Sequence, residues 1–466
     1  MSQPIIVKKV SISGNNRTKL SFFDNEISDT LNVSSIDQLR SSLDRLHGNL
    51  MSKGLFDTVD INVDEIKKNN DSNSIPIEIN VKVTEKGIPF LKMESFVRQH
   101  NGSNNVGCEI QGALRSPLGY GESLRVSIGQ SSTGSKDTLI VADIPNVTDY
   151  HLNTQVTIQS KEENNSYFLS FKQKIHSIVT DFEAKNKAHK VVCELAVRDE
   201  IPLPNTKFAH AKDISVELMR SLISSTKIST KYVYTYDDRD NGASPSTGNY
   251  LQSTTELALP SGSAQFLKTE LSTQLHRTLG PGIFGQPGLV ASLCGNLGLL
   301  IPLKVFGFEP TTSTGYLGNG KIPHMSDRFY LGGPLSLRGF HNYGIGSRNS
   351  LVAGGSQFGD PFGGISKSSL LLSLSVPIPV MSLAQNNGRA FMFFNAGSLG
   401  SPNYWAISRN KEKLSLFGAP RVSIGGGLSF AFGSAARLEG TYTIPLLKSN
   451  SDVVKPFQLG VSLTIN

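Results

Sequence analysis

The C-terminal stretch FQLGVSLTI, Phe457 to Ile465, alternates strictly between two kinds of side chain. Apolar residues occupy the odd positions, and small or polar residues occupy the even ones, Gln458, Gly460, Ser462 and Thr464. Successive side chains of a β-strand point to opposite faces, so this stretch predicts a strand with one apolar and one polar face. Its length matches the roughly nine to eleven residues that a tilted strand needs to cross a membrane.

The same alternation recurs throughout the chain from residue 88 onward. We count about seventeen segments of suitable length. They fall near 88–98, 105–115, 121–130, 137–144, 152–160, 166–176, 189–198, 213–222, 226–237, 249–259, 264–277, 288–301, 368–378, 389–397, 421–432, 434–445 and 456–465. The segment 213–222 has the weakest alternation. The sequence therefore predicts a mainly β protein built from many short strands.

Periodicity does not say which face of such strands points outward. Tyr232, Tyr234 and Tyr236 form an aromatic row suited to an outer face or a membrane interface. A soluble β-sandwich or barrel with its apolar face inward would show the same alternation. The many glycines and small polar residues on the other parity favour a large lumen, with the apolar face toward lipid.

Composition is compatible with a membrane barrel. The 466 residues include 44 glycines, are 18% charged and 38% hydrophobic, and have a mean hydropathy of −0.15. A barrel exposes only alternate residues of each strand to lipid, so its average hydropathy stays near that of a soluble protein. The net charge of +7 is scattered, without a basic cluster interleaved with aromatics. We therefore expect membrane lipid, and not nucleic acid, as a partner.

Motifs for catalysis or cofactor binding are weak. The run GPGIFG, Gly280 to Gly285, has the spacing of a dinucleotide loop but contains Pro281 and follows no βαβ unit. The nine histidines show no metal-ligand spacing, and Cys108, Cys193 and Cys294 are too far apart for a CxxC pair. We expect no enzyme activity, cofactor, metal or nucleotide. The start, MSQPIIVKKV, also predicts no secretory signal or presequence.

Residues 5–86 show a different order, which is strand, helix, helix, strand, strand. The second predicted helix carries one apolar stripe, formed by Ile36, Leu39, Leu43, Leu46 and Leu50. Ser35 is its candidate N-cap, and Gly54 stands where a left-handed terminator belongs. Alternation over 54–64 and 75–83 then predicts two half-buried strands.

A long connection, 302–366, contains the run DRFYLGGPLSLRGF, in which we single out Asp327, Arg328, Phe329, Tyr330, Gly332, Gly333, Arg338, Gly339 and Phe340. This run resembles the signature loop of the BamA-type barrel-assembly superfamily, and most closely that of its mitochondrial branch, the sorting and assembly machinery (SAM). The helix that ends in GLF, followed by an alternating strand, resembles a polypeptide-transport-associated (POTRA) domain. The resemblance covers nearly the whole chain.

The resemblance implies a specific architecture. Residues 88–466 would form a 16-stranded transmembrane antiparallel β-barrel, and residues 1–87 one small α+β, POTRA-like soluble domain before it. Relatives carry sixteen strands, so we assign 213–222 to a loop or strand extension. In relatives the signature loop folds back into the lumen, which here would make 302–366 a lumen loop.

The resemblance also suggests partners for the arginine at the loop tip. Arg338 would be a buried cation facing the inner wall, where it needs an acceptor to offset its desolvation. Asn395 is one candidate, because the wider family often has Asp two residues before a glycine of a late strand, here Gly397. Glu439 is the other candidate, since it lies on the same strand face as the polar Thr441 and would therefore face the lumen. Both stay open on the sequence.

In relatives the first and last strands meet in a weak seam that opens as a lateral gate. The residues of this gate would be Phe90, Lys92, Glu94, Phe96 and Arg98 on one side, and Phe457, Leu459, Gly460, Val461 and Leu463 on the other. Opening such a seam would let a precursor satisfy its backbone hydrogen bonds by strand addition. The C-terminal polar-x-Gly pattern also matches the signal of such precursors.

The resemblance therefore implies an insertase that folds and inserts β-barrel precursor proteins into the mitochondrial outer membrane. Its N-terminal domain would lie in the intermembrane space, and its partners would be precursors and metaxin-like accessory subunits of the SAM complex. Two alternatives stay open, a passive outer-membrane pore and a two-partner-type polypeptide translocator. The long loop and the added domain argue against the first, and the translocator class normally carries a cleaved signal and paired soluble modules.

Overall fold

The structure is a computed structural model of the chain. It describes residues 5–31, 33, 35–66, 75–87, 89–100, 103–132, 134–144, 152–164, 171–184, 186–202, 224–282, 285–303, 323–348, 359–380, 387–400, 417–433 and 436–463. The segment 213–222 lies outside the described residues. Within the described part, none of the helices has the length and apolar character that crossing a membrane requires.

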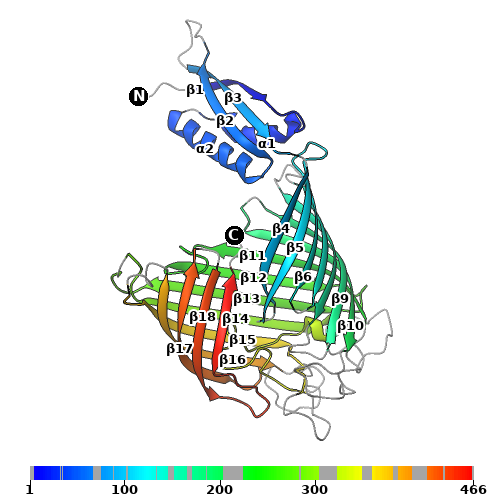
Figure 1. Ribbon diagram of the computed structural model, residues 1–466, viewed down its shortest axis with the longest axis vertical. Helices are drawn as coiled ribbons and strands as arrows, with labels where there is room; N and C mark the ends of the chain where they lie inside the picture. The colour runs from blue at the N-terminus through cyan, green and yellow to red at the C-terminus, as the bar shows by residue number, and fades with distance from the viewer. Residues whose placement is uncertain are drawn as a thin grey trace. The chain divides into compact units, whose positions relative to one another are not determined.

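The N-terminal domain is a three-stranded sheet with two helices beside it (Figure 1). Its elements are β1 (Ile5–Ser13), α1 (Leu20–Leu31), α2 (Ile36–Ser52), β2 (Phe56–Glu65) and β3 (Ile75–Glu85). Strand β3 lies in the middle, parallel to β1 and antiparallel to β2. This is the order that the sequence predicts.

Helix α2 begins and ends largely where the sequence indicates. The Ser35 side chain accepts a hydrogen bond from the Gln38 backbone at the N-cap, and Gly54 has a φ of 68° after the last turn. Leu46 and Leu50 are buried in the core that the helices share with the sheet. The prediction for Ile36 was wrong: its side chain is 55% exposed, because it stands in the first turn, before the part of the helix that reaches the core.

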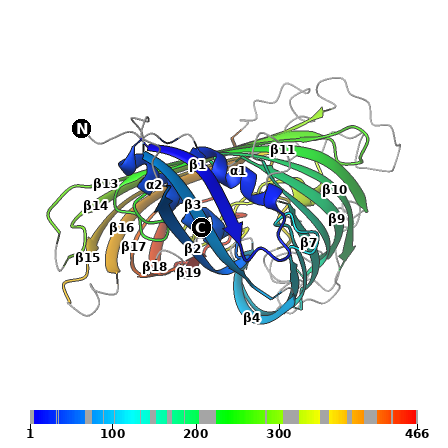
Figure 2. The ribbon, with the colours of Figure 1, turned by 90° about the horizontal axis from the view of Figure 1, so that it is seen from above.

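The remaining strands form one sixteen-stranded sheet in which each strand pairs with its neighbours in chain order. They are β4 (Pro89–His100), β5 (Ser103–Arg115), β6 (Ser123–Ser131), β7 (Lys136–Ile144), β8 (Asn153–Asn164), β9 (Phe171–Glu183), β10 (His189–Pro202), β11 (Ser225–Asp237), β12 (Gly248–Ala258), β13 (Phe266–Thr278), β14 (Val290–Pro302), β15 (Ser366–Pro377), β16 (Gly388–Gly400), β17 (Arg421–Phe432), β18 (Ala436–Leu447) and β19 (Phe457–Leu463). Every register resolved between β9 and β19 is antiparallel. Strands β13 to β18 lie side by side in Figure 2. The predicted sixteen strands are confirmed.

The two parities of these strands differ in exposure as the alternation predicts. In β18 the apolar Leu438, Tyr442 and Ile444 are exposed, whereas Glu439 and Thr441 are buried. In β19 the side chains of Phe457 and Leu459 are exposed and that of Gln458 is buried. The polar parity therefore forms an inner face, and the apolar parity forms an outer face that is exposed in the described residues.

Candidate functional site

The connection between β14 and β15 packs onto the inner face of the sheet. Its described parts are residue 303, residues 323–348 and residues 359–365, and we refer to the last two segments as the lumen loop. Five of its apolar side chains enter one buried cluster with residues of β12, β13, β14 and β16 and of the turn before β13. The cluster contains Phe329, Leu331, Leu337, Phe340 and Ile345 from the loop, and Ala258, Ala264, Phe266, Leu300 and Leu399 from the wall. Burying each large side chain contributes roughly 2 kcal/mol, so the loop is held firmly.

Two wall glycines make room for this packing. A Cβ atom added at Gly298 of β14 would lie 2.8 Å from the ring of Phe329. One added at Gly397 of β16 would lie 3.0 Å from the Leu337 side chain. These distances are shorter than ordinary van der Waals contact, so the loop can approach the strands only where a side chain is absent.

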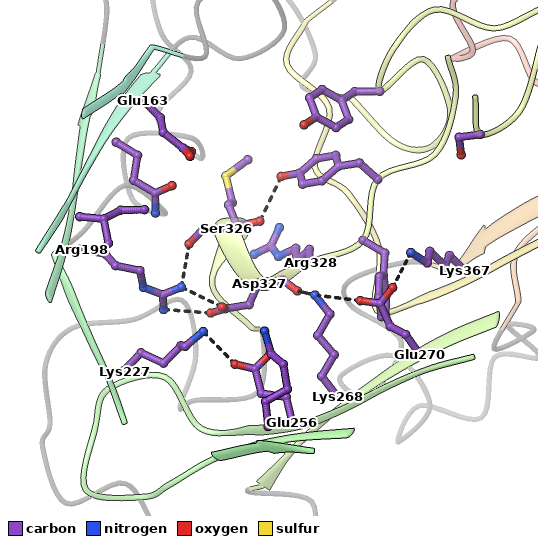
Figure 3. A pocket seen from close by; sticks show the side chains of 18 of the residues that line it. Glu163, Arg198, Lys227, Glu256, Lys268, Glu270, Ser326, Asp327, Arg328 and Lys367 are labelled. Carbon is purple, nitrogen blue, oxygen red and sulfur yellow. Dashed lines mark hydrogen bonds and ion pairs between the residues drawn. The ribbon is translucent and has the colours of Figure 1, made fainter. Parts of the chain in front are cut away.

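One end of the motif is fixed by a buried ion pair. Arg198 of β10 donates two hydrogen bonds, of 2.8 and 3.0 Å, to the Asp327 carboxylate, and the two side chains are 6% and 5% exposed (Figure 3). Lys268 of β13 donates to the Asp327 backbone oxygen at 3.0 Å. Burial acts to raise the pKa of the Asp327 carboxyl, but the charge and hydrogen bonds of Arg198 outweigh it and hold that pKa well below its usual range.

A cavity of about 870 Å³ lies between this ion pair and the wall. Its charged side chains form ion pairs between strands of the wall, as Figure 3 shows for Lys227 with Glu256 and for Lys367 with Glu270. Lys227 lies 2.8 Å from both Glu194 and Glu256, and Lys367 lies 2.7 Å from Glu270. Because cations and anions alternate, the cavity offers a polar surface without one dominant sign of charge.

The arginine tip forms a second ion pair on another part of the wall. Arg338 Nη2 lies 2.7 Å from Glu439 Oε2 of β18, and both side chains are buried. The guanidinium also stands over the rings of Phe393 and Phe391, with its carbon 5.0 and 5.7 Å from their centroids. Arg437 approaches the same carboxylate at 3.1 Å. Between the two candidate partners, Glu439 therefore binds the guanidinium.

The side chain of Asn395 contacts the backbone of Arg338. With its amide oriented to satisfy both neighbours, its oxygen accepts from the Arg338 backbone N–H at 2.7 Å and its nitrogen donates to the Leu370 oxygen at 3.1 Å. The Ser423 hydroxyl donates to the Arg338 oxygen at 2.8 Å. The side chain and both backbone groups of Arg338 thus have partners on the wall, which offsets much of the desolvation of a buried cation.

Glycines give the tip its shape. Gly339 has a φ of 89°, and an added Cβ would lie 2.7 Å from the Thr443 side chain. Gly332 and Gly333 have φ values of 115° and 110°, a region that other residues rarely adopt. Phe340 follows with no exposed surface. The glycines of the motif therefore stand where the backbone has a positive φ or where the loop lies close to the wall.

Arg328 and Tyr330 of the motif form hydrogen bonds to other residues of the loop. Arg328 donates to the backbone oxygens of Pro323 and Phe362 at 2.8 and 2.9 Å. The Tyr330 hydroxyl donates to the Met325 oxygen at 3.2 Å, and burial raises the pKa of that phenol. Because these side chains form hydrogen bonds within the loop, they suit a structural role.

Comparison with known proteins identifies the family. A family model described as the Omp85 superfamily domain matches residues 109–465. The chain belongs to the Omp85 superfamily. A second model, POTRA, described as a surface antigen variable number repeat, matches residues 5–86. The resemblance predicted from the signature loop is confirmed, and so is the expectation of a non-enzymatic protein.

Relatives of this Omp85 protein are similar over nearly all of its length. A SAM50-like protein of Schizosaccharomyces pombe is 26% identical, with 99% of this chain and 90% of that protein covered. The sorting and assembly machinery component 50 homolog of Homo sapiens is also 26% identical, with 96% and 87% covered. The crystal structure of BamA from Haemophilus ducreyi lacking POTRA domains 1-3 gives a TM-score of 0.72 at 18% identity, with 98% of this chain and 85% of that chain covered. This likeness shows the predicted fold, a barrel preceded by a small α+β domain.

The residues predicted for the gate lie on the two terminal strands of the sheet order. Strand β4 carries Phe90, Lys92, Glu94, Phe96 and Arg98, but among these only the side chain of Lys92 lies in the described part, where it is exposed. On β19, Phe457 and Leu459 face outward, Gly460 is buried against the lumen loop, and Val461 is half-buried. The Leu463 side chain lies outside the described part. In the described residues, β4 and β19 are therefore the two edge strands of the sheet.

Sequence reasoning missed the partners that the wall supplies to the loop. Arg198 and Gln458 both contact the motif and were not among the predicted site residues. A signal was present for Gln458, because it stands on the inward parity of the last strand. Arg198 stands at the end of the predicted strand 189–198, and its partner Asp327 lies 129 residues away in the chain. In the described residues, no group of three or more His, Cys, Asp or Glu side chains could hold a metal ion.

Proposed function

We propose that this Omp85 protein folds β-barrel precursor proteins and inserts them into the mitochondrial outer membrane through a lateral gate between β4 and β19. The observation that carries the proposal is the contact of Arg338 with Glu439, which seats the lumen loop on β18, next to the last strand. The similarity to the sorting and assembly machinery component 50 homolog of Homo sapiens and to the SAM50-like protein of Schizosaccharomyces pombe supports the same activity.

Strand addition supplies the physical mechanism. A strand at the end of a sheet presents unpaired N–H and C=O groups, and each such group costs several kcal/mol in hydrocarbon. A precursor strand that pairs with β4 or β19 satisfies its own groups and those of the gate together. The free energy of burial and pairing drives this step, so no nucleotide is required.

The proposal assigns a role to each part of the chain. Residues 88–466 form the membrane-embedded barrel, whose apolar outer face contacts lipid, and residues 1–87 form the soluble domain. This domain lies in the intermembrane space, where the edges of its sheet, β1 and β2, receive unfolded precursors by strand addition. Metaxin-like accessory subunits complete the complex.

Site-specific crosslinking of an arrested precursor tests the proposal. A photoreactive residue is placed at outward positions of the terminal strands, Leu91 and Leu459, and at Leu372 of β15 as a control on the same outer face. We expect precursor adducts at the first two positions and not at the third. Equal adducts at all three positions would contradict the gate. Stable ion conductance without any precursor adduct would indicate a passive pore instead.

The location of the domains is tested separately. Mitochondria that carry this chain are treated with protease before and after rupture of the outer membrane. We expect residues 1–87 to be cleaved only after rupture. Cleavage in intact mitochondria would place the domain on the cytosolic side.

A further inference from the structure

The side chain of Gln458 joins the last strand to the lumen loop. Gln458 is 3% exposed on the inner face of β19. Its Oε1 accepts a hydrogen bond from the Gly339 N–H at 2.9 Å, and its Nε2 donates to the Phe340 oxygen at 2.7 Å. A carboxamide carries one acceptor and one donor group, and here both are used by consecutive residues of the arginine tip.

The segment before Gln458 also pairs with the loop through its backbone. Lys455 N–H donates to the Gly339 oxygen at 2.9 Å, and His341 N–H donates to the Val453 oxygen at 2.8 Å. The Val453 N–H donates in turn to the Gly344 oxygen at 2.8 Å. The loop and the approach to β19 therefore form a continuous hydrogen-bonded strip.

Close packing extends the strip beyond Gln458. A Cβ atom added at Gly460 would lie 3.1 Å from Pro334 and 3.2 Å from Leu335 of the loop. The Arg338 ion pair, in contrast, is made to β18 and not to β19. Within β19 itself, Gln458 supplies the side-chain hydrogen bonds to the tip, and Gly460 supplies only a surface.

We infer that Gln458 is a positioning residue that couples the lumen loop to β19, so that the loop tip and the last strand keep a fixed distance from each other. The inference rests on the proposed function only where it treats β19 as a gate strand. Each neutral hydrogen bond changes the ratio of detached to docked molecules by roughly a factor of five, so losing both raises that ratio about 25-fold. Motion of β19 then follows motion of the tip less closely.

Distances between spin labels measure this coupling directly. Labels are attached at Ser336 of the loop and at Leu459 of β19, both exposed, in full-length protein whose three native cysteines are replaced by serine. We expect a narrow distance distribution in this background and a broad one after Gln458→Leu. The matched control is Gln274→Leu on β13, whose side-chain oxygen accepts from Arg239 and not from the loop.

A second substitution distinguishes the loss of a hydrogen bond from misfolding of the variant. Gln458→Glu keeps the acceptor for Gly339, but its ionised form has no donor for the Phe340 oxygen, and protonation restores one. We expect a broad distribution at pH 8 that narrows as the pH falls toward 5. Unchanged distributions in both variants, or equal broadening in Gln274→Leu, would overturn the inference. A protein that assembles no precursor yet shows the expected distributions would refute the proposed function and leave the coupling intact.

Discussion

Arg198 and Asp327 lie 129 residues apart in the chain, yet they form the two-hydrogen-bond ion pair that fixes the start of the signature motif. Arg198 belongs to β10, and the arginine tip of the same loop is bound eight strands later on β18. The loop is therefore held at two separated places on the inner face. A buried pair of this kind orients the chain well, because either partner left alone would be an unpaired charge.

Breaking this pair from one side should destabilise the protein strongly. Asp327→Asn leaves Arg198 buried without its counter-charge, so we expect a loss of roughly 3–5 kcal/mol in the free energy of unfolding. Denaturant titration in detergent measures it. The double variant Asp327→Asn, Arg198→Met should lose less than the sum of the single variants. As a control, Arg125→Met breaks a half-exposed pair with Asp143 and should cost less than about 1 kcal/mol.

The pH dependence of the loop follows from the lowered pKa of Asp327. A carboxyl whose pKa is lower in the folded state than in the unfolded state stabilises the protein above its unfolded pKa of roughly 4, and loses this contribution as the pH falls below it. We therefore expect protection of the loop from protease to be constant from pH 8 to 5. In Arg198→Met the chief cause of the lowering is gone and burial then raises the pKa of Asp327, so protection should be weaker at pH 8 than in the unmodified protein and should recover as the pH falls. Loss of protection near pH 6 in the unmodified protein would contradict this account.

Arg338→Ala should slow precursor assembly without unfolding the barrel. The substitution removes the tip's ion pair but leaves the buried cluster around Phe329 and Leu337 in place. Assembly of labelled precursor in mitochondria carrying the variant measures the rate, and heat-modifiable gel mobility monitors folding. Arg338→Lys keeps the charge and should retain part of the rate, whereas Glu439→Gln should resemble Arg338→Ala. Unchanged assembly kinetics would exclude a role for the tip.

Gly298→Ala tests the close approach of the loop to β14. The added methyl group would stand 2.8 Å from the Phe329 ring, and overpacking of this kind costs roughly 1–3 kcal/mol. We expect faster proteolysis of the loop, and partial rescue by Phe329→Leu. Gly112→Ala on β5 is the control, because no atom of the described residues lies within 4 Å of its added Cβ atom. Equal effects of both alanines would point to a general intolerance of the strands.

Paired cysteines test whether the terminal strands meet. We choose Leu459 for β19, because its side chain is 63% exposed, whereas a side chain at Gly460 would meet Pro334. Cysteines at Leu91 or Met93, both exposed on β4, complete the pairs. We expect a disulfide with at least one of them under mild oxidation, and less of it while a precursor is arrested. Failure at both positions and their neighbours would reject the seam.

Local patterns in the sequence carry much of the fold. Alternation of side chains indicates a strand wherever it occurs, since each residue's face depends only on its position in the pleat. Most of the strands, the capped helix after Ser35 and the apolar parity of β18 follow from such patterns, whereas the number sixteen came from the resemblance. Ile36 shows the limit, because periodicity cannot tell how far a sheet extends under a helix.

By itself the sequence determined which residues form strands, which parity is apolar, and that a motif containing Arg338 interrupts the late strands. Only the tertiary structure decided what this motif touches: Asp327 meets Arg198, Arg338 binds Glu439, and Gln458 holds the tip. The physical reason is that a strand's face is set by neighbours along the chain. A contact across the lumen depends instead on the register and curvature of many strands together.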